Sequence, residues 1–309
     1  MKHKHIEGLI AAPFTPFHTD GSLHLELIPA YYKMLVSNGV VGAFICGSTG
    51  EGVSLTMSEK KLVMEAWANV ANGNPDFTVI PFLGGTCIAD CKDLALHAKS
   101  IGLRAVAFTT PFYFKPANAA ALAKACIEIG EAVPELAFYY YHIPVLTGVH
   151  ITMYELLQAI HGKLANFAGI KYTHEDFMDY LSCMRFADGA YDMLWGRDEN
   201  MLSALVLGAK GAVGSTYNYA APLYLSLIEA YNNHDFEKAR LLQQQSIDMI
   251  RLLGKYGGIA TGKAYMKKIG MDCGAFRLPV SNMSDAQFDL FSADVDALGF
   301  STYASKISL

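Results

Sequence analysis

The stretch FAGIKYTHED, residues 167–176, contains a short apolar run that ends in a lysine. No polar residue interrupts Phe167 to Ile170, as is typical of a strand that is buried on both faces of a parallel sheet. Lys171 follows at the end of this strand, and a helix is predicted to begin within a few residues. Why a lysine stands at the inner end of a buried strand depends on the fold around it.

The same pattern recurs along the chain, since short apolar runs closed by Gly, Thr, Pro or Ser alternate with helical segments. These further runs occupy residues 7–14, 42–47, 77–85, 105–113, 136–144, 192–196 and 211–216. Eight strands, each followed by a helix and with no break in composition, predict a (β/α)8 TIM barrel, in the α/β class. A doubly wound open sheet is the alternative.

The helices between the strands carry start and stop signals. Thr56 with Glu59, and Thr152 with Glu155, have the spacing of a capping box. We predict that residues 1–219 form the barrel and carry the active site. Residues 220–309 are predicted to be C-terminal helices that pack on the barrel as part of a single structural unit.

Composition excludes several classes of function. The chain has 309 residues, of which 52% are hydrophobic and 17% charged, with a net charge of -5. It has no basic patch for nucleic acid, no apolar run near the ~18 residues of a membrane span, and no signal-peptide core. The six cysteines lack zinc-site spacing and are expected to be buried, reduced thiols. We therefore predict a cytoplasmic protein without a metal site.

The active site of such a barrel lies at the carboxyl ends of its strands, where Lys171 is predicted. Burial disfavours an ammonium and lowers its pKa, and a neutral amine can attack a ketone to form a Schiff base. The alternative is that Lys171 extends its charged end towards solvent or pairs with Glu51, Asp198 or Glu199. The position of Lys171 alone does not decide between the two interpretations.

Two further strand ends offer polar groups. Tyr141 ends the fifth strand, where it could relay protons or could simply be a core tyrosine with a satisfied hydroxyl. Tyr139 and Tyr141 must share one face of that strand and Tyr140 the other, because strand side chains alternate. The turn GSTGEG, residues 47–52, could hold a carboxylate with its amides and hydroxyls, or could be an ordinary tight turn.

The stretch WGRDEN, residues 195–200, places two adjacent carboxylates at the end of the seventh strand. Asp198 and Glu199 would repel phosphate, but they could accept hydrogen bonds from an uncharged group that is rich in hydroxyls. The alternative for either residue is the favourable placing of acidic side chains at a helix N-terminus.

Taken together, three motifs resemble one enzyme family. GSTGE at 47–51, the tyrosine before HIP at 142–144 and GIKYT at 169–173 are similar in order and spacing to the class I pyruvate aldolases, the dihydrodipicolinate synthase and N-acetylneuraminate lyase family. The resemblance covers essentially the whole chain. Residues 139–149 and 194–218 are most similar to the branch that cleaves N-acetylneuraminate. The synthase branch usually carries an arginine shortly after its YNVP-type motif, and none follows Pro144 here.

The resemblance implies catalytic roles at the strand ends. Lys171 would form the Schiff base with the keto carbon, and Tyr141 would move the proton between substrate and solvent. Ser48 and Thr49 would hold the pyruvate carboxylate and orient the Tyr141 hydroxyl. Tyr113 would reach into the site of a neighbouring subunit and complete the relay.

The resemblance also implies which residues hold the rest of the substrate. Thr173 would contact the hydroxyl that is lost as an aldehyde. The glycerol-like tail of sialic acid would be bound by Gly196, Asp198, Glu199 and Ser215, which gives the two carboxylates a reason to be adjacent.

The expected reaction is the reversible retro-aldol cleavage of N-acetylneuraminate to N-acetylmannosamine and pyruvate by a homotetramer. The resemblance implies no cofactor beyond the covalent imine on Lys171, because an iminium does the work of a Lewis acid. The alternatives are a dihydrodipicolinate synthase or another pyruvate-dependent sugar-acid aldolase. Less similar classes are a non-catalytic barrel that binds a keto acid and a pyridoxal-phosphate barrel, for which no convincing phosphate loop is present.

Overall fold

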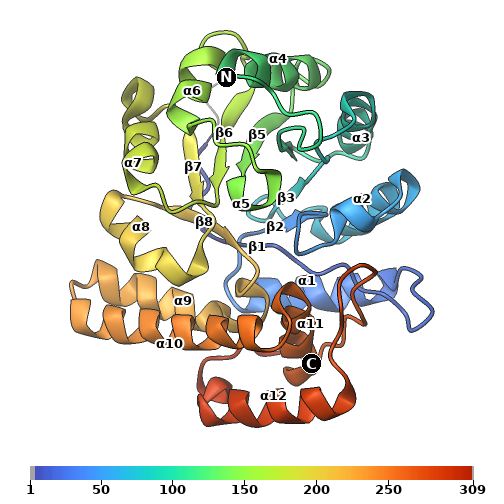
Figure 1. The fold of residues 1–309 in the computed structure, drawn as a ribbon, viewed down its shortest axis with the longest axis vertical. Helices are drawn as coiled ribbons and strands as arrows, with labels where there is room; N and C mark the ends of the chain where they lie inside the picture. The colour runs from blue at the N-terminus through green and yellow to red at the C-terminus, as the bar shows by residue number, and fades with distance from the viewer. Residues whose placement is uncertain (1–3, 308–309) are drawn as a thin grey trace.

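The computed structural model describes residues 4–307 and contains an eight-stranded parallel barrel (Figure 1). The strands are β1 (Gly8–Ala11), β2 (Gly42–Ile45), β3 (Thr78–Pro81), β4 (Ala105–Phe108), β5 (Ala137–His142), β6 (Phe167–Tyr172), β7 (Asp192–Trp195) and β8 (Gly211–Gly214). Their order in the sheet is β3-β2-β1-β8-β7-β6-β5-β4, and a bridge between Phe82 and Ala107 joins its two ends. The predicted TIM barrel is confirmed, and the open sheet is wrong.

Helices follow the strands and cover the outside of the barrel. They are α1 (Ile28–Ser37), α2 (Met57–Ala71), α3 (Ile88–Ser100), α4 (Ala119–Gly130), α6 (Met153–Ile160), α7 (Phe177–Arg185), α8 (Met201–Leu207) and α9 (Tyr217–Asn232), with the short α5 (Pro144–Thr147) after β5. The capping box of Thr56 and Glu59 is complete. At Thr152 the Glu155 amide is capped, but the Glu155 carboxylate accepts the threonine hydroxyl.

The C-terminal helices form a layer against one side of the barrel, below it in Figure 1. This layer contains α10 (Phe236–Lys255), α11 (Thr261–Lys268) and α12 (Asp285–Ala297), and α9 packs between α10 and strand β1. The predicted division at 219/220 falls inside α9, where Ala220 has a non-helical backbone. The C-terminal layer therefore continues directly from the last helix of the barrel.

Two apolar layers hold the fold together. One lies inside the barrel and includes Phe44, Tyr139 and Tyr141, and the other lies between the sheet and the helices and includes Tyr140. The predicted alternation of the three tyrosines is confirmed. Strand register pairs Tyr141 with Lys171, so the two residues stand at the same level at the carboxyl end.

Two expectations from composition can be compared with residues 4–307. None of the helices described there is long and apolar enough to cross a membrane. The six cysteines are free, and five are buried as expected. The expectation is wrong for Cys87, which is exposed because it stands at the N-cap position of α3.

Candidate active site

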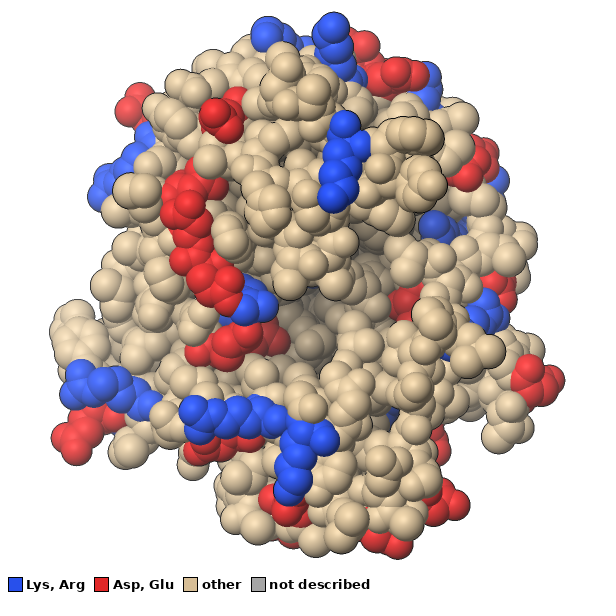
Figure 2. Space-filling model, viewed as in Figure 1, with Lys and Arg blue, Asp and Glu red and all other residues tan. Residues whose placement is uncertain are grey.

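A cavity of about 290 Å³ opens at the carboxyl ends of the strands. The space-filling view shows a hollow in the middle of this face, bordered on one side by acidic and basic side chains (Figure 2). Nine of the ten predicted site residues line the cavity: Ser48, Thr49, Tyr141, Lys171, Thr173, Gly196, Asp198, Glu199 and Ser215. Residues that lie far apart in the sequence meet here because each follows a strand of the same barrel.

Lys171 lies at the floor of the cavity and is 4% exposed. Its Nζ lies 4.1 Å from the ring centre of Phe44 and 4.0 Å from that of Tyr141. The carboxylates that could have paired with it are engaged elsewhere or lie farther away. Glu51 pairs with Lys263, Glu199 contacts Arg197, and no ion pair joins Asp198 to Lys171 within residues 4–307.

The surroundings of Lys171 favour the neutral amine. Burial lowers the pKa of Lys171 to about 7, although the Asp198 carboxylate acts in the opposite direction. The ring faces of Phe44 and Tyr141 would also favour the ammonium form. Because the pKa is lowered all the same, burial is the stronger effect. At neutral pH roughly half of such amines are uncharged, against roughly one in a few thousand for an ordinary lysine. The site can therefore supply a nucleophilic amine.

Tyr141 presents its hydroxyl to the same cavity. Burial raises the pKa of Tyr141 to about 12, and the hydroxyls of Ser48 and Thr173 partly oppose that rise. Its ring packs edge-on against Phe44 and Phe82, which fixes its direction. The phenol therefore stays protonated and faces two further hydroxyls, as a proton relay requires.

The turn after β2 has an unusual backbone. Cys46 and Glu51 both have a φ of 56°, a left-handed conformation that costs a non-glycine residue about 1 kcal/mol or more. Gly52 cannot be replaced there, because a Cβ would lie 1.7 Å from the carbonyl oxygen of Cys46. The turn brings Ser48 and Thr49 to the cavity and can hold a carboxylate.

Asp198 is buried and has one free oxygen. Its Oδ2 accepts hydrogen bonds from the Thr216 amide (3.1 Å) and hydroxyl (2.6 Å), whereas no group of residues 4–307 donates a hydrogen bond to Oδ1. Burial raises the pKa of Asp198, and the hydrogen bonds from Thr216 oppose the rise. Gly214 is required beside it, because a Cβ there would lie 2.0 Å from Oδ1. The buried Tyr217 hydroxyl and a hydroxyl of a ligand are therefore the donors open to Oδ1.

Arg197 also lines the cavity, and the sequence analysis did not single it out. Its guanidinium pairs with Glu175, and its Nε lies 3.4 Å from Glu199 Oε1. The arginine therefore lies between Glu175 and the predicted tail ligand Glu199 and links the loops after β6 and β7. Its position within WGRDEN was the available signal, since it precedes the two carboxylates directly.

Two residues at the strand ends lie outside the cavity. Tyr113, the tenth predicted residue, does not line it and is 80% exposed. His142, a neighbour of Tyr141, points to the outer side of the sheet and packs against Tyr172 and His174. Burial and two nearby histidines lower the pKa of His142 to about 3, so it stays neutral.

The C-terminal layer contributes an apolar wall that strand ends could not predict. Ile250 and Leu253 of α10, with Ile259 after it, line the cavity. Gln243 of α10 also fixes the loop after β7, because it accepts from the Leu202 amide and donates to the carbonyl of Asp198. The C-terminal layer is thus part of the site.

Replacing Gly196 by alanine is expected to destabilise the protein by about 1–3 kcal/mol. A Cβ there would lie 2.0 Å from Thr173 Oγ1 and 3.0 Å from the Tyr172 carbonyl oxygen, so β6 and β7 must separate. Denaturant unfolding would measure the loss. Gly254→Ala in α10 is the matched control, since its Cβ meets nothing within 4 Å, and it should be neutral or stabilising. Equal stability of the two variants would contradict the packing argument.

One surface cluster has the residue types of a metal site. Within residues 4–307, His18, His24 and Glu26 place ligand atoms within 4.8 Å of one another. The three residues lie on the surface between β1 and α1, and none of them lines the cavity. They do not contribute to the site described above.

Three comparisons agree with this geometry. Residues 5–298 match the model of the dihydrodipicolinate synthetase family. The N-acetylneuraminate lyase of Rattus norvegicus is 38% identical over 298 residues, which are 95% of this chain and 92% of the rat protein. The structure of Proteus mirabilis N-acetylneuraminate lyase has a TM-score of 0.93 at 38% identity and covers 96% of this chain and 100% of its own. A dihydrodipicolinate synthase structure is less similar, with a TM-score of 0.86 at 25% identity, covering 96% and 100%.

Proposed function

The chain belongs to the dihydrodipicolinate synthetase family, and within it we propose that the protein cleaves N-acetylneuraminate reversibly to N-acetylmannosamine and pyruvate. The observation that carries the proposal is Lys171, a buried amine that has no ion pair within residues 4–307 and that shares its cavity with two adjacent carboxylates. A Schiff-base aldolase needs such an amine, and a substrate with a polyhydroxylated tail needs such a rim.

The first stage is formation of the imine. The neutral Nζ of Lys171 attacks the keto carbon of the open-chain substrate, and loss of water gives an iminium. The turn carrying Ser48 and Thr49 holds the substrate carboxylate, which fixes the keto carbon near Nζ. The imine is the only covalent group that the proposal requires, and it involves no separate cofactor.

The second stage is cleavage of a carbon–carbon bond. A proton leaves the substrate hydroxyl nearest the reacting bond, and that carbon becomes the aldehyde of N-acetylmannosamine. The electron pair of the broken bond moves to the iminium and leaves an enamine of pyruvate. Protonation of the enamine carbon and hydrolysis of the imine then release pyruvate. Tyr141, facing Ser48 and Thr173, is placed to move these protons, with Thr173 at the hydroxyl.

The two family branches differ in what the rim should recognise. Val145 and Leu146 of α5 line the cavity where the synthase branch carries an arginine for a second carboxylate. The free Oδ1 of Asp198 and the carboxylate of Glu199 instead offer acceptors to hydroxyl groups. These features favour a sugar-acid substrate over the synthase reaction.

Pyruvate release from N-acetylneuraminate, coupled to lactate dehydrogenase, tests the proposal. Release of pyruvate is expected from the purified protein without added cofactor. Borohydride reduction in the presence of pyruvate alone should attach one reduced pyruvate to the protein. If the folded protein forms this adduct but does not cleave N-acetylneuraminate, the substrate is another sugar acid. If it forms no adduct, a non-catalytic barrel is favoured.

The paired change of Asp198→Asn and Glu199→Gln is expected to lower kcat/KM for N-acetylneuraminate about a hundredfold or more. Each hydrogen bond from a hydroxyl to a carboxylate contributes about 1.5–3 kcal/mol, and both charges are lost. Pyruvate has no hydroxylated tail, so the pyruvate concentration that half-saturates borohydride trapping should change less than about threefold. An unchanged kcat/KM would remove the assignment of the tail pocket.

We also propose that the protein is a homotetramer in which Tyr113 completes the site of a neighbouring subunit. Tyr113 and Phe114 are both largely exposed, and Val145 and Leu146 are exposed beside the cavity mouth. Lys115 donates to the Gly148 carbonyl (3.0 Å), so the two exposed segments lie together. Such a patch is typical of a protein–protein interface. A monomeric mass by light scattering would contradict this proposal.

A cytoplasmic location is proposed on the six free cysteines, which suit a reducing compartment. Cell fractionation would test it, and recovery of the protein outside the cytoplasm would contradict it.

A further inference from the structure

Glu51 joins the carboxylate-binding turn to the C-terminal layer. It lies in the turn at residues 47–52, two residues after Thr49, and its side chain is buried. Its Oε1 lies 2.8 Å from Lys263 Nζ, and its Oε2 accepts the Arg277 backbone amide at 2.8 Å. The C-terminal layer thus holds a side chain that belongs to the turn itself.

Lys263 is buried to the same degree as its partner, since the two side chains are 4% and 3% exposed. Its Nζ also donates to the Ala275 carbonyl (3.0 Å) and lies over the rings of Phe17 and Phe276. Burial lowers the pKa of Lys263, and Glu51 opposes this effect. A buried charge is tolerated only with a partner, so each of the two residues requires the other. No step of the proposed reaction uses this ion pair.

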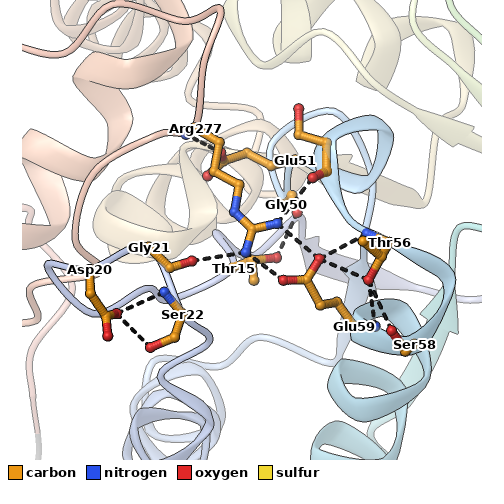
Figure 3. A network of polar contacts seen from close by, with 11 residues as sticks. Thr15, Asp20, Gly21, Ser22, Gly50, Glu51, Thr56, Ser58, Glu59 and Arg277 are labelled. Carbon is orange, nitrogen blue, oxygen red and sulfur yellow. Dashed lines mark hydrogen bonds and ion pairs between the residues drawn. The ribbon is translucent and has the colours of Figure 1, made fainter.

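Further contacts fix the turn from both sides. Thr15 Oγ1 donates to the Gly50 carbonyl at 2.6 Å. The Arg277 guanidinium donates to Glu59 of α2, to the Ser54 carbonyl and to the Gly21 carbonyl of the loop before α1. Figure 3 shows Arg277 between these two regions, with Glu51 and Gly50 beside it. These contacts fix the chain at Gly50 and from Ser54 onwards, and leave the Glu51 side chain to Lys263 and the Arg277 amide.

The backbone conformation of Glu51 requires contacts that hold it in place. Glu51 has φ 56° and ψ 28°, so a non-glycine residue is held in the left-handed region directly after the turn. Such a conformation persists only where surrounding contacts hold it. Here the Glu51 side chain is held by its contacts with Lys263 and with the Arg277 amide.

We propose that Glu51 and Lys263 are positioning residues for the proposed reaction: the ion pair holds the turn at Ser48 and Thr49 and cancels the negative charge that Glu51 brings to an anion-binding site. The proposal rests on the proposed function, in which that turn binds the substrate carboxylate. Neither residue lines the cavity, so both act through the turn.

Two single changes at this ion pair should have unequal effects. Lys263→Met leaves an uncompensated carboxylate beside the anion site, whereas Glu51→Gln leaves an uncompensated ammonium. Lys263→Met should raise the KM for N-acetylneuraminate about ten- to a hundredfold, while kcat changes less than about threefold. Glu51→Gln keeps the side-chain volume and an acceptor for the Arg277 amide, so its KM should rise less.

The experiment measures KM, kcat, the pyruvate concentration for half-saturation of borohydride trapping, and the melting temperature of each variant. Lys268→Met is the matched control, because it removes an ion pair from the same helix, to Asp296 of α12, without touching Glu51. Its KM and trapping should equal those of the unchanged protein. When it is assayed well below its melting temperature, Lys263→Met should show a raised KM. The pyruvate concentration that half-saturates its trapping should be raised as well.

The possible outcomes separate the two proposals. A folded Lys263→Met variant with unchanged KM and trapping overturns the positioning role, even if its melting temperature falls. If Lys263→Met does not fold, Glu51→Gln decides: a smaller rise in KM and in half-saturation supports the positioning role, and unchanged values of both overturn it. An original protein that neither cleaves N-acetylneuraminate nor traps pyruvate overturns the proposed function, and the positioning proposal with it.

Discussion

Lys171→Ala should abolish pyruvate release, with kcat falling by at least about four orders of magnitude. Removing a covalent nucleophile leaves only binding and the remaining polar groups to act on the substrate. Lys171 borders the cavity and makes no ion pair within residues 4–307, so its removal breaks no buried charge pair and the variant should fold. The coupled lactate dehydrogenase assay measures the loss, and the melting temperature checks the fold.

Lys263 provides an internal control for this prediction. It is as buried as Lys171, but it pairs with Glu51 and lies outside the cavity. After borohydride reduction with pyruvate, peptide mass analysis should place the adduct on Lys171 and leave Lys263 unmodified. An adduct on the Lys171→Ala variant, or pyruvate release by it, would contradict the assignment.

The lowered pKa of Lys171 predicts the pH dependence of trapping. The neutral amine is the reactive form, and its fraction rises as pH rises through a pKa of about 7. Initial trapping rates at limiting pyruvate should therefore increase from pH 6 to pH 8 and level off above that range. An ordinary lysine pKa would instead give a rate that still rises at pH 9.

The sequence was sufficient for the fold and for most of the site because the signals are local. A parallel strand buried on both faces is an unbroken apolar run, and in a TIM barrel the residues that follow such runs meet at one end. Lys171, Tyr141 and Asp198 could therefore be placed in one cavity before their distances were known. The roles assigned to them came from the family resemblance, which position alone did not decide.

The parts that the sequence did not predict depend on contacts between distant segments. Ile250 and Leu253 line the cavity only because α10 packs beside the barrel mouth, and no periodicity in α10 indicates this. From its place at a strand end Glu51 is a possible partner of Lys171, but it pairs with Lys263, whose approach is set by the packing of α11. The left-handed backbone of Cys46 and Glu51 was also missed, because neither is a glycine.

Tyr141→Phe tests the proton relay with the smallest structural change. The variant keeps the ring that lies 4.0 Å from Lys171 Nζ and packs against Phe44 and Phe82, so the environment of the amine is retained. Only the hydroxyl that faces Ser48 and Thr173 is lost. We expect kcat to fall about a hundred- to ten-thousandfold, the usual contribution of a positioned acid–base group, with a much smaller change in KM.

Exchange of the pyruvate methyl protons in D2O, followed by NMR, isolates this step from the sugar. Exchange requires the imine and the enamine but no polyol, so it should slow in Tyr141→Phe as cleavage does. Tyr140→Phe is the matched control, because Tyr140 is equally buried but faces the helices rather than the cavity. It should keep kcat and the exchange rate within about threefold, since its hydroxyl lies outside the site. If Tyr141→Phe retained more than a tenth of both rates, the proton would have to move through Ser48, Thr173 or water, and Tyr141 would serve only to pack against Lys171.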